Sequence, residues 1–132
     1  MQTATSTNIY QLTEEQLAVR DAAREFAQEL WAGVIERDEH QKFPTEQVRK
    51  MGELGFMGMM VSPEYGGSGL DTVSYVLAME EISKVDASCS VIMSVNNSLV
   101  CWGLEQYGTE EQKQKYLPRL CSGEIIGAFA LS

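Results

Sequence analysis

Histidine is almost absent from the sequence: His40 is the only one in 132 residues, and it lies in the charged stretch 36–42. A zinc site needs several converging His or Cys ligands, and a hydrolytic triad needs a His beside its nucleophile. The sequence therefore argues against both chemistries and predicts no metal site. We interpret His40 as a solvated loop residue.

Long apolar runs are also missing. The best candidates are interrupted by polar residues every third or fourth position, whereas a membrane span needs roughly 20 apolar residues. The first twelve residues, MQTATSTNIYQL, lack the basic start and apolar segment of a secretory signal, and they contain no Arg of the kind found in transit peptides. We interpret residues 1–12 as a polar lead-in and expect no membrane association.

Basic residues are scarce, since ten Lys and Arg stand against nineteen Asp and Glu, for a formal net charge of -9. The electrostatic field of this negative charge repels nucleic-acid phosphates and anionic lipid headgroups, so we expect no nucleic-acid partner. Of the three cysteines, Cys89 and Cys101 fall in one predicted helix about 18 Å apart, so they cannot bridge each other. The odd number and this spacing favour a reducing compartment, most simply a cytoplasm.

Helical periodicity is what the sequence contains in abundance. Hydrophobic residues make up 44% and charged residues 22%, which are ordinary globular values. Capping-box patterns begin at Thr13 and Thr109, and Asp71 can cap another helix. Helices are expected from about 13 into the thirties, then over 43–55, 71–84, 88–107 and 109–122. The predicted fold class is all-α, a bundle of about five helices, with a charged linker at 36–42.

The Gly-rich loop at 66–69 favours a tight turn over a phosphate site, because no strand leads into it and Asp71 would repel an anion. Residues 124–132 have no helix cap and are rich in small and apolar side chains, which is typical of a strand. We therefore expect a helical domain over 13–123 and, at 124–132, the first strand of a β domain that the chain does not contain.

The segment 88–107 is the most informative predicted helix. Its apolar positions recur at helical spacing and widen into a broad stripe, which predicts a central, buried helix anchored by Val91, Val95, Leu99 and Trp102. Four polar residues interrupt it: Ser94, Asn96, Asn97 and Ser98. Either they form a hydrogen-bonded network with neighbouring segments or they line a ligand cavity, and their spacing does not separate these interpretations.

Several ordered motifs together resemble one family. They are PEYGGSGLD at 63–71, AMEEIS at 78–83, SVNNSL at 94–99, YGTEEQK at 107–113 and GAFALS at 127–132. In this combination and order, the sequence resembles the amino-terminal helical domain of acyl-CoA dehydrogenases from about Leu12 to its last residue. The motifs at 94–99 and 127–132 are most similar to the short-chain (butyryl-CoA) branch.

The resemblance implies a three-domain flavoprotein oxidoreductase of fatty acid or amino acid catabolism. Such an enzyme removes hydrogens from Cα and Cβ of a short acyl-CoA thioester, FAD takes the hydride, and an electron-transferring flavoprotein reoxidises the flavin. The proton-abstracting glutamate belongs to the carboxy-terminal domain, beyond Ser132, so no catalytic residue is expected in this chain and the chain alone is expected to be inactive. The resemblance also implies a homotetramer, located in the cytoplasm of a bacterium or the mitochondrial matrix of a eukaryote.

By motif position, the resemblance implies two groups of binding residues. The start of the flavin-contacting segment corresponds to Phe129, Ala130, Leu131 and Ser132. Contacts to the acyl chain of the substrate correspond to Ser94, Val95 and Leu99. Chain length and branching of the acyl group stay open, because selectivity depends on the full lining of a cavity.

Three alternatives share the predicted helical domain. Acyl-CoA oxidases pass electrons to oxygen, and flavin-dependent monooxygenases are relatives of the same fold. A third possibility, from a different class, is a stand-alone helical interaction module whose apolar face docks a partner.

Overall fold

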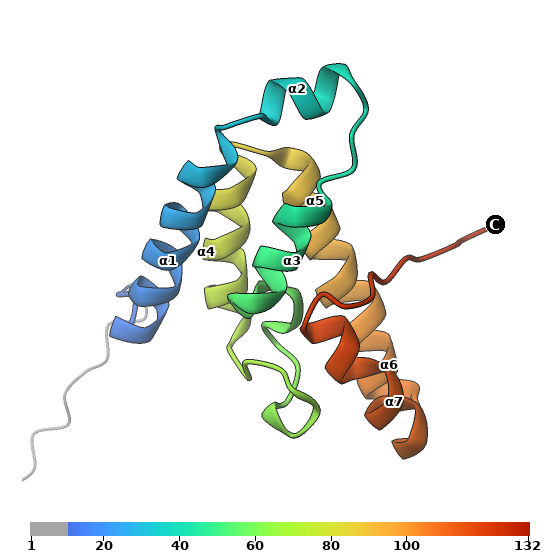
Figure 1. Cartoon of the computed structure of the whole chain (residues 1–132). Coiled ribbons are helices and arrows are strands. Elements are labelled where there is room, and N and C mark those ends of the chain that lie inside the picture. The colour runs from blue at the N-terminus through green and yellow to red at the C-terminus, as the bar shows by residue number, and fades with distance from the viewer. Residues whose placement is uncertain (1–10) are drawn as a thin grey trace, which may run out of the picture.

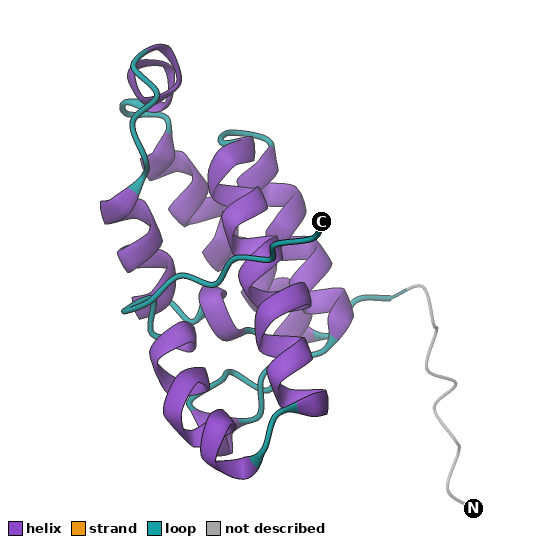
Figure 2. Cartoon of the chain, turned by 90° about the vertical axis from the view of Figure 1, so that its right-hand side faces the viewer, coloured by secondary structure: helices purple, strands orange, loops and turns teal. Residues whose placement is uncertain are grey.

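The computed structural model describes residues 11–132, and within that range it contains helices and loops and no strand (Figures 1 and 2). The helices are α1 (Glu14–Leu30), α2 (Val34–Glu39), α3 (Thr45–Glu53), α4 (Thr72–Ser83), α5 (Ala87–Ser94), α6 (Trp102–Tyr107) and α7 (Glu110–Cys121). Single 3-10 turns occur at η1 (Phe56–Gly58) and η2 (Pro63–Tyr65), and a π-helical segment, η3 (Val95–Cys101), joins α5 to α6. The predicted all-α fold is confirmed, whereas the predicted lead-in lies almost entirely outside the described residues.

Both capping boxes form as their sequences predict. The Thr13 hydroxyl accepts from the Gln16 amide nitrogen at 3.2 Å, and the Gln16 side chain accepts from the Thr13 amide at 3.0 Å. The same pair of bonds joins Thr109 and Gln112 at the start of α7, at 3.2 and 2.8 Å. Two free backbone donors are thereby satisfied at each helix start.

The short helix α2 corrects the expectation of an unstructured charged linker. Gly33 adopts φ +90° and separates α2 from α1. Arg37 of α2 donates to the carboxylate of Asp86 at 2.9 Å and to the Leu30 carbonyl at 3.2 Å. This partly buried ion pair is a long-range contact, 49 residues apart in sequence, so local periodicity carries no sign of it.

The Gly-rich loop doubles back on the segment that precedes it. The amides of Ser68, Gly69 and Leu70 donate to carbonyls within 58–61 at 2.8–2.9 Å. A Cβ atom at Gly67 would lie 2.0 Å from the Val61 carbonyl oxygen, so the approach requires glycine. These contacts favour the interpretation of the loop as a tight structural turn.

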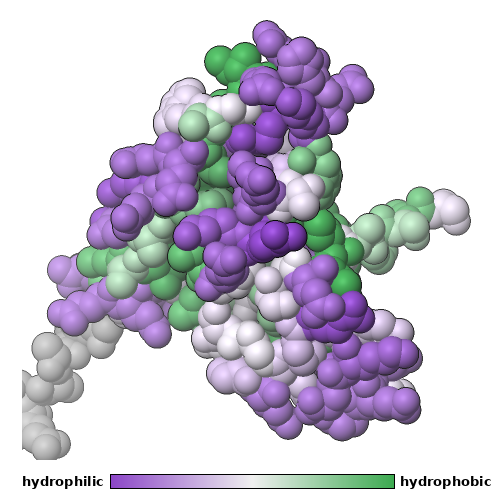
Figure 3. All heavy atoms as spheres, viewed as in Figure 1, coloured by the Kyte–Doolittle hydropathy of each residue, from purple (hydrophilic) through white to green (hydrophobic). Residues whose placement is uncertain are grey.

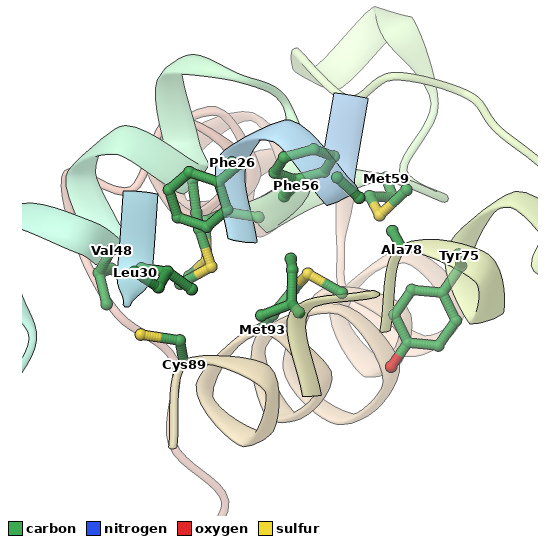
Figure 4. Close-up of a cluster of buried hydrophobic side chains, with 13 residues drawn as sticks. Phe26, Leu30, Val48, Phe56, Met59, Tyr75, Ala78, Cys89 and Met93 are labelled. Atoms are coloured by element: carbon green, nitrogen blue, oxygen red, sulfur yellow. The ribbon is translucent and has the colours of Figure 1, made fainter. Parts of the chain in front are cut away.

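The main core lies where α1, α3, α4 and α5 meet η1 (Figure 4). Phe26 and Phe56 pack with ring centroids 5.9 Å apart, and Met51, Met57 and Met93 are fully buried. A second buried cluster joins the loop after η1 to η3 and α7; its members are Val61, Tyr65, Cys101, Leu117, Leu120 and Cys121. These three methionines therefore act as gap-filling core residues, which suits their flexible side chains.

The predicted helix over 88–107 exists, but it faces the other way. The run Ala87–Tyr107 is one continuous helical stretch of 21 residues. Three of the four residues of its expected buried stripe are instead exposed, at 59% for Val91, 45% for Leu99 and 49% for Trp102, and Val95 is half-buried. The buried face carries Cys89, Ser90, Met93, Asn96, Asn97 and Cys101. The expectation of a central, buried helix anchored by its apolar stripe was therefore wrong.

By length and composition alone, this run could cross a membrane, contrary to the expectation that long apolar runs are missing. The run also contacts α3 and α4 and carries two buried asparagines. Such packing and internal hydrogen bonding are those of a helix that contributes one side to a protein core.

Residues 124–132 form no strand in the described chain and instead run as an extended coil that passes the helices and then projects away from them (Figures 1 and 2). A strand is defined by ladder hydrogen bonds to a partner strand, and residues 11–132 supply no such partner. The end of this tail leaves the helical body with apolar side chains exposed, including Leu131 at 85% (Figure 3).

Candidate functional site

The π-helical segment is the irregular feature of the long helical run. Within it, the Asn97 side chain donates to the Met93 carbonyl at 2.9 Å, and the Ser98 hydroxyl donates to the Ser94 carbonyl at 2.8 Å. Side-chain donors thereby occupy carbonyls one turn earlier, where a regular helix would use backbone amides. π-helical turns inside α-helices are frequent at functional sites, which directs attention to this segment.

Asn97 fixes the inner side of the segment to η1. Its Nδ2 donates to the Phe56 carbonyl at 2.8 Å, and its Oδ1 accepts from the Met59 amide at 2.7 Å. The side chain is 2% exposed. Every polar atom of this buried amide therefore has a protein partner.

Asn96 connects three segments that are far apart in sequence. Its Nδ2 donates to the carbonyls of Met57 at 2.7 Å and Leu120 at 3.3 Å, and its Oδ1 accepts from the Gly127 amide at 2.9 Å. The residue is completely buried. For the two asparagines, the structure favours the hydrogen-bonded network over the wall of a cavity.

Ser94, Val95 and Leu99, the predicted acyl-chain contacts, have more solvent contact than the two asparagines. Val95 is half-buried and Leu99 is exposed. Ser94 is half-buried, and its hydroxyl accepts from the Tyr75 hydroxyl of α4 at 3.0 Å. The side chain of Ser94 is thus held in place by α4, and sequence reasoning missed Tyr75 because nothing in the local pattern signals this contact.

Phe129, Ala130, Leu131 and Ser132, the predicted flavin contacts, lie in the exposed tail. Among the described residues, the backbone of 128–132 has no hydrogen-bond partner, so its amides and carbonyls are free to meet a ligand.

The tail starts beside the π-helical segment. The Gly127 amide bonds to Asn96, and a Cβ atom at Gly127 would lie 2.7 Å from the Val100 side chain. Glycine is therefore needed for the tail to pass so close. The structure connects the two predicted groups of binding residues through this one crossing point.

Ionisable groups hold the helices together away from this segment. Glu81 of α4 is buried and accepts from Arg24 of α1 at 3.1 and 3.2 Å and from Lys84 at 2.7 Å. These hydrogen bonds, first the one from Arg24, lower the pKa of Glu81 to about 2. Within residues 11–132, no group of three or more His, Cys, Asp or Glu side chains could hold a metal ion.

A surface cavity of about 830 Å³ lies elsewhere, between α2, the segment 41–44 and the start of α5. Ile35, Phe43 and Val91 contribute exposed apolar side chains to its lining, and the Arg37–Asp86 ion pair also borders it. It contains none of the residues predicted to bind substrate or flavin.

Curated relatives match nearly the whole chain. The short-chain specific acyl-CoA dehydrogenase of Clostridium acetobutylicum is 49% identical over 124 residues, which is 93% of this chain and 33% of that protein. The mitochondrial short-chain specific acyl-CoA dehydrogenase of Bos taurus is 48% identical over 123 residues, which is 92% of this chain and 30% of that protein. The chain thus spans about one third of the length of these relatives.

Solved structures match the fold. Butyryl-CoA dehydrogenase from Megasphaera elsdenii superposes with a TM-score of 0.85 at 36% identity, covering 93% of this chain and 33% of that one. A chain in a structure of the electron transferring flavoprotein of Acidaminococcus fermentans superposes with a TM-score of 0.84 at 44% identity. The match covers 89% of this chain and 31% of that one. A glutaryl-CoA dehydrogenase from Mycobacterium smegmatis in complex with FADH2 superposes with a TM-score of 0.83 at 34% identity. The match covers 87% of this chain and 30% of that one.

A family model described as the N-terminal domain of acyl-CoA dehydrogenase matches residues 13–124. The match includes the capping box at Thr13, the Gly-rich turn, the π-helical segment and all of α7. The chain therefore belongs to the acyl-CoA dehydrogenase family, of which these residues form the N-terminal helical domain.

Proposed function

We propose that this chain is the helical domain of a FAD-dependent enzyme that dehydrogenates short acyl-CoA thioesters between Cα and Cβ. The observation that carries the proposal is the two-sided π-helical segment, whose inner asparagines fix the backbone while Val95 and Leu99 remain available on its outside. A cofactor enzyme needs such walls, because the protein positions the substrate and excludes water while the cofactor supplies the redox chemistry.

Ser94, Val95 and Leu99 would form one wall of the acyl-chain site, with Val95 and Leu99 as its apolar members. The Tyr75 hydroxyl holds Ser94, so this part of the wall is fixed before substrate arrives. A rigid wall favours binding because less side-chain entropy is lost when the ligand enters. The short-chain relatives support a small acyl group, whereas the identity of the wall residues alone does not set chain length.

Phe129, Ala130, Leu131 and Ser132 would contact the flavin. FAD would supply the hydride acceptor, and this chain's contribution is a set of unpaired backbone groups and the Ser132 hydroxyl. Asn96 would set the position of this tail through its bond to Gly127. The neighbour in complex with FADH2, the reduced form of FAD, supports FAD as the cofactor.

The same proposal extends to partners and location. Residues 124–132 would lead into a β domain, and the proton-abstracting base would belong to a further domain. An electron-transferring flavoprotein would accept the electrons, and the neighbour found in a structure named for such a flavoprotein supports this partner. The full-length protein would be a homotetramer. The bacterial and mitochondrial relatives support a bacterial cytoplasm or a mitochondrial matrix.

A domain exchange tests the proposal. Residues 13–124 replace the matching segment of the Clostridium acetobutylicum relative, and the purified hybrid is expected to be yellow and to lose its flavin colour on adding butyryl-CoA without oxygen. The 132-residue chain alone is expected to be colourless after desalting from FAD, since the resemblance assigns the base and further flavin contacts to other domains. Tight flavin binding by the chain alone would contradict this division of the site.

Within the hybrid, Leu99→Trp tests the wall directly. The bulkier ring is expected to lower kcat/KM for butyryl-CoA by about tenfold or more while flavin content stays unchanged, because it intrudes where the acyl chain would lie. Ile35→Trp is the matched control, since Ile35 is also an exposed aliphatic residue but lies on α2. Equal kcat/KM in the two variants would refute the role of Leu99.

A further inference from the structure

Helix α2 projects from one end of the helical body (Figure 1), and none of its residues is buried. Among the described residues, one hydrogen bond joins α2 to a part of the chain that is distant in sequence: Arg37 donates to the Asp86 carboxylate at 2.9 Å. The guanidinium also donates to the carbonyls of Leu30 at 3.2 Å and Ala32 at 3.3 Å. Because a helix of six residues is too short to be stable by itself, this one side chain fixes the position of α2.

The backbone has a positive φ on both sides of α2. Gly33 precedes the helix with φ +90°, and Gln41 follows it with φ +51°. Within residues 11–132, Gln41 is the only non-glycine residue in this region, where a side chain costs conformational energy. The two positions mark the ends of a segment that can turn as one piece, and a turn allows Gln41 to leave its strained conformation.

Apolar side chains from three segments border the cavity beside α2. Ile35 of α2 is 68% exposed, Phe43 is 55% exposed and Val91 of α5 is 59% exposed. All three line the same cavity, whose volume of about 830 Å³ leaves room for the Ile35 side chain. Removing this apolar surface from water is favourable, so the hydrophobic effect favours an arrangement in which α2 lies against α5.

The Asp86 carboxylate opposes this movement. It is 4% exposed, and it accepts from the Cys89 amide at 3.0 Å as the N-cap of α5. Although burial disfavours the charged form, hydrogen bonds from the Cys89 amide and from Arg37 keep the pKa of Asp86 below its ordinary value. Withdrawing Arg37 leaves a buried charge without its partner, which is strongly unfavourable. The Arg37–Asp86 ion pair is therefore a latch that holds α2 away from the cavity.

We propose that residues 33–41 form a flap that closes over this cavity when Arg37 leaves Asp86. The flap turns about its two ends, and Ile35 then packs against the other two apolar side chains of the cavity. The latched state has an ion pair where the closed state has apolar contacts, so the flap has two discrete positions. The structure shows the latched position.

Closing also changes the outer face of the long helical run. The closed flap covers Val91, which lies four residues, or about one helical turn, before Val95. The latch belongs to the same run, because Asp86 caps its first turn. A molecule that competes for Arg37 therefore alters the apolar surface that this run presents.

Asp86→Asn tests the latch in the 132-residue chain, because asparagine can still cap α5 but carries no charge to hold Arg37. The reporter is Ile35→Cys, whose thiol is exposed in the latched state, whereas the three native thiols are buried. The fast phase of the reaction with a chromogenic thiol reagent therefore measures the introduced thiol. We expect this phase to slow at least about fivefold on adding Asp86→Asn, which corresponds to a closed flap in about four-fifths of the molecules.

Two controls separate closing from loosening. Asp38→Asn is the matched control, since Asp38 is an exposed carboxylate of α2 that borders the same cavity, and it is expected to leave the reaction rate unchanged. Glu39→Cys places a second reporter at the exposed end of α2, and its thiol is expected to react equally fast with and without Asp86→Asn. If the thiol introduced at position 35 reacts as fast or faster with Asp86→Asn, the released helix detaches instead of closing, and the proposal is overturned.

A cross-link gives a second readout. Mild oxidation of a chain with both Ile35→Cys and Val91→Cys is expected to join the two introduced thiols within one chain, at least about fivefold faster with Asp86→Asn than without it, because a disulfide needs Cα atoms within about 7 Å of each other. Circular dichroism checks that each variant is folded, and Arg37→Gln replaces Asp86→Asn where the latter unfolds the chain. Equal rates of cross-linking with and without the latch contradict the proposal.

Discussion

Replacing Asn96 by Leu is the sharpest test of the hydrogen-bonded network. The substitution keeps the approximate volume but removes one donor group and one acceptor. The carbonyl of Met57 and the amide of Gly127 then lose their partner, and the carbonyl of Leu120 keeps only the Gly123 amide, at 3.3 Å. Leaving a buried polar group unsatisfied costs about 1–3 kcal/mol. The carbonyls belong to residues that are 0% and 3% exposed, whereas Gly127 is half-buried and can recruit water.

The burial of an apolar side chain offsets part of this cost. We therefore expect a net loss of about 1–3 kcal/mol for Asn96→Leu and a similar loss for Asn97→Leu. Urea denaturation of the chain, followed by far-ultraviolet circular dichroism, measures it. With an m-value of about 1.5 kcal/mol/M, a loss of 2 kcal/mol lowers the midpoint by about 1.3 M.

Gln106→Leu is the matched control, because Gln106 is an exposed amide on the same helical run. A surface substitution of this kind is expected to change the free energy of unfolding by less than about 0.5 kcal/mol. If the two asparagine variants keep the urea midpoint of the parent chain, the asparagines do not hold the π-helical segment. Their proposed roles in fixing the acyl-chain wall and the tail are then refuted as well.

Two further predictions concern stability. Glu81 has a pKa of about 2 in the folded chain and an ordinary pKa in the unfolded chain. Its ionised form therefore adds to the free energy of unfolding in full above about pH 4.5, and this contribution is lost as the pH falls toward 2. Glu81→Gln should therefore be less stable than the parent at pH 7, and this difference should shrink in acid denaturation curves below pH 4.5. Gly52→Ala, which in an open helix stabilises by up to about 1 kcal/mol, should instead destabilise by about 1–3 kcal/mol, because its Cβ atom would lie 2.0 Å from the Ser122 carbonyl oxygen. A melting temperature of Gly52→Ala above that of the parent chain would show that α3 and the end of α7 do not lie as close together as in the structure.

The parts of the fold that local chemistry controls were predictable from sequence. The capping box at Thr13 and the cap at Asp71 set helix starts with bonds that span three residues, and both form as predicted. Helix α2 was missed because Arg37 finds its partner, Asp86, 49 residues away. No periodicity encodes such a contact.

The candidate site was predictable only in part, for the same reason. The polar residues at 94–98 could be recognised as unusual in an apolar helix, but their partners could not be named. Asn96 bonds to groups 24, 31 and 39 residues away, and Ser94 bonds to Tyr75, 19 residues away. Each partner became visible only after the helices were packed.

The orientation of the long helical run shows why hydrophobicity alone misled the sequence analysis. Both sides of the run are apolar enough to be buried, so transfer free energy differs little between the two orientations. Hydrogen bonding does differ, because turning Asn96 and Asn97 outward would leave the carbonyls of Met57 and Phe56 and the amide of Met59 without these partners in the core. At about 1–3 kcal/mol for each unsatisfied group, this cost exceeds the roughly 1.5–3 kcal/mol gained by burying one aliphatic side chain such as Leu99. The polar residues thus select the inner face and leave Val91, Leu99 and Trp102 outside, and of these three Leu99 belongs to the acyl-chain wall proposed above.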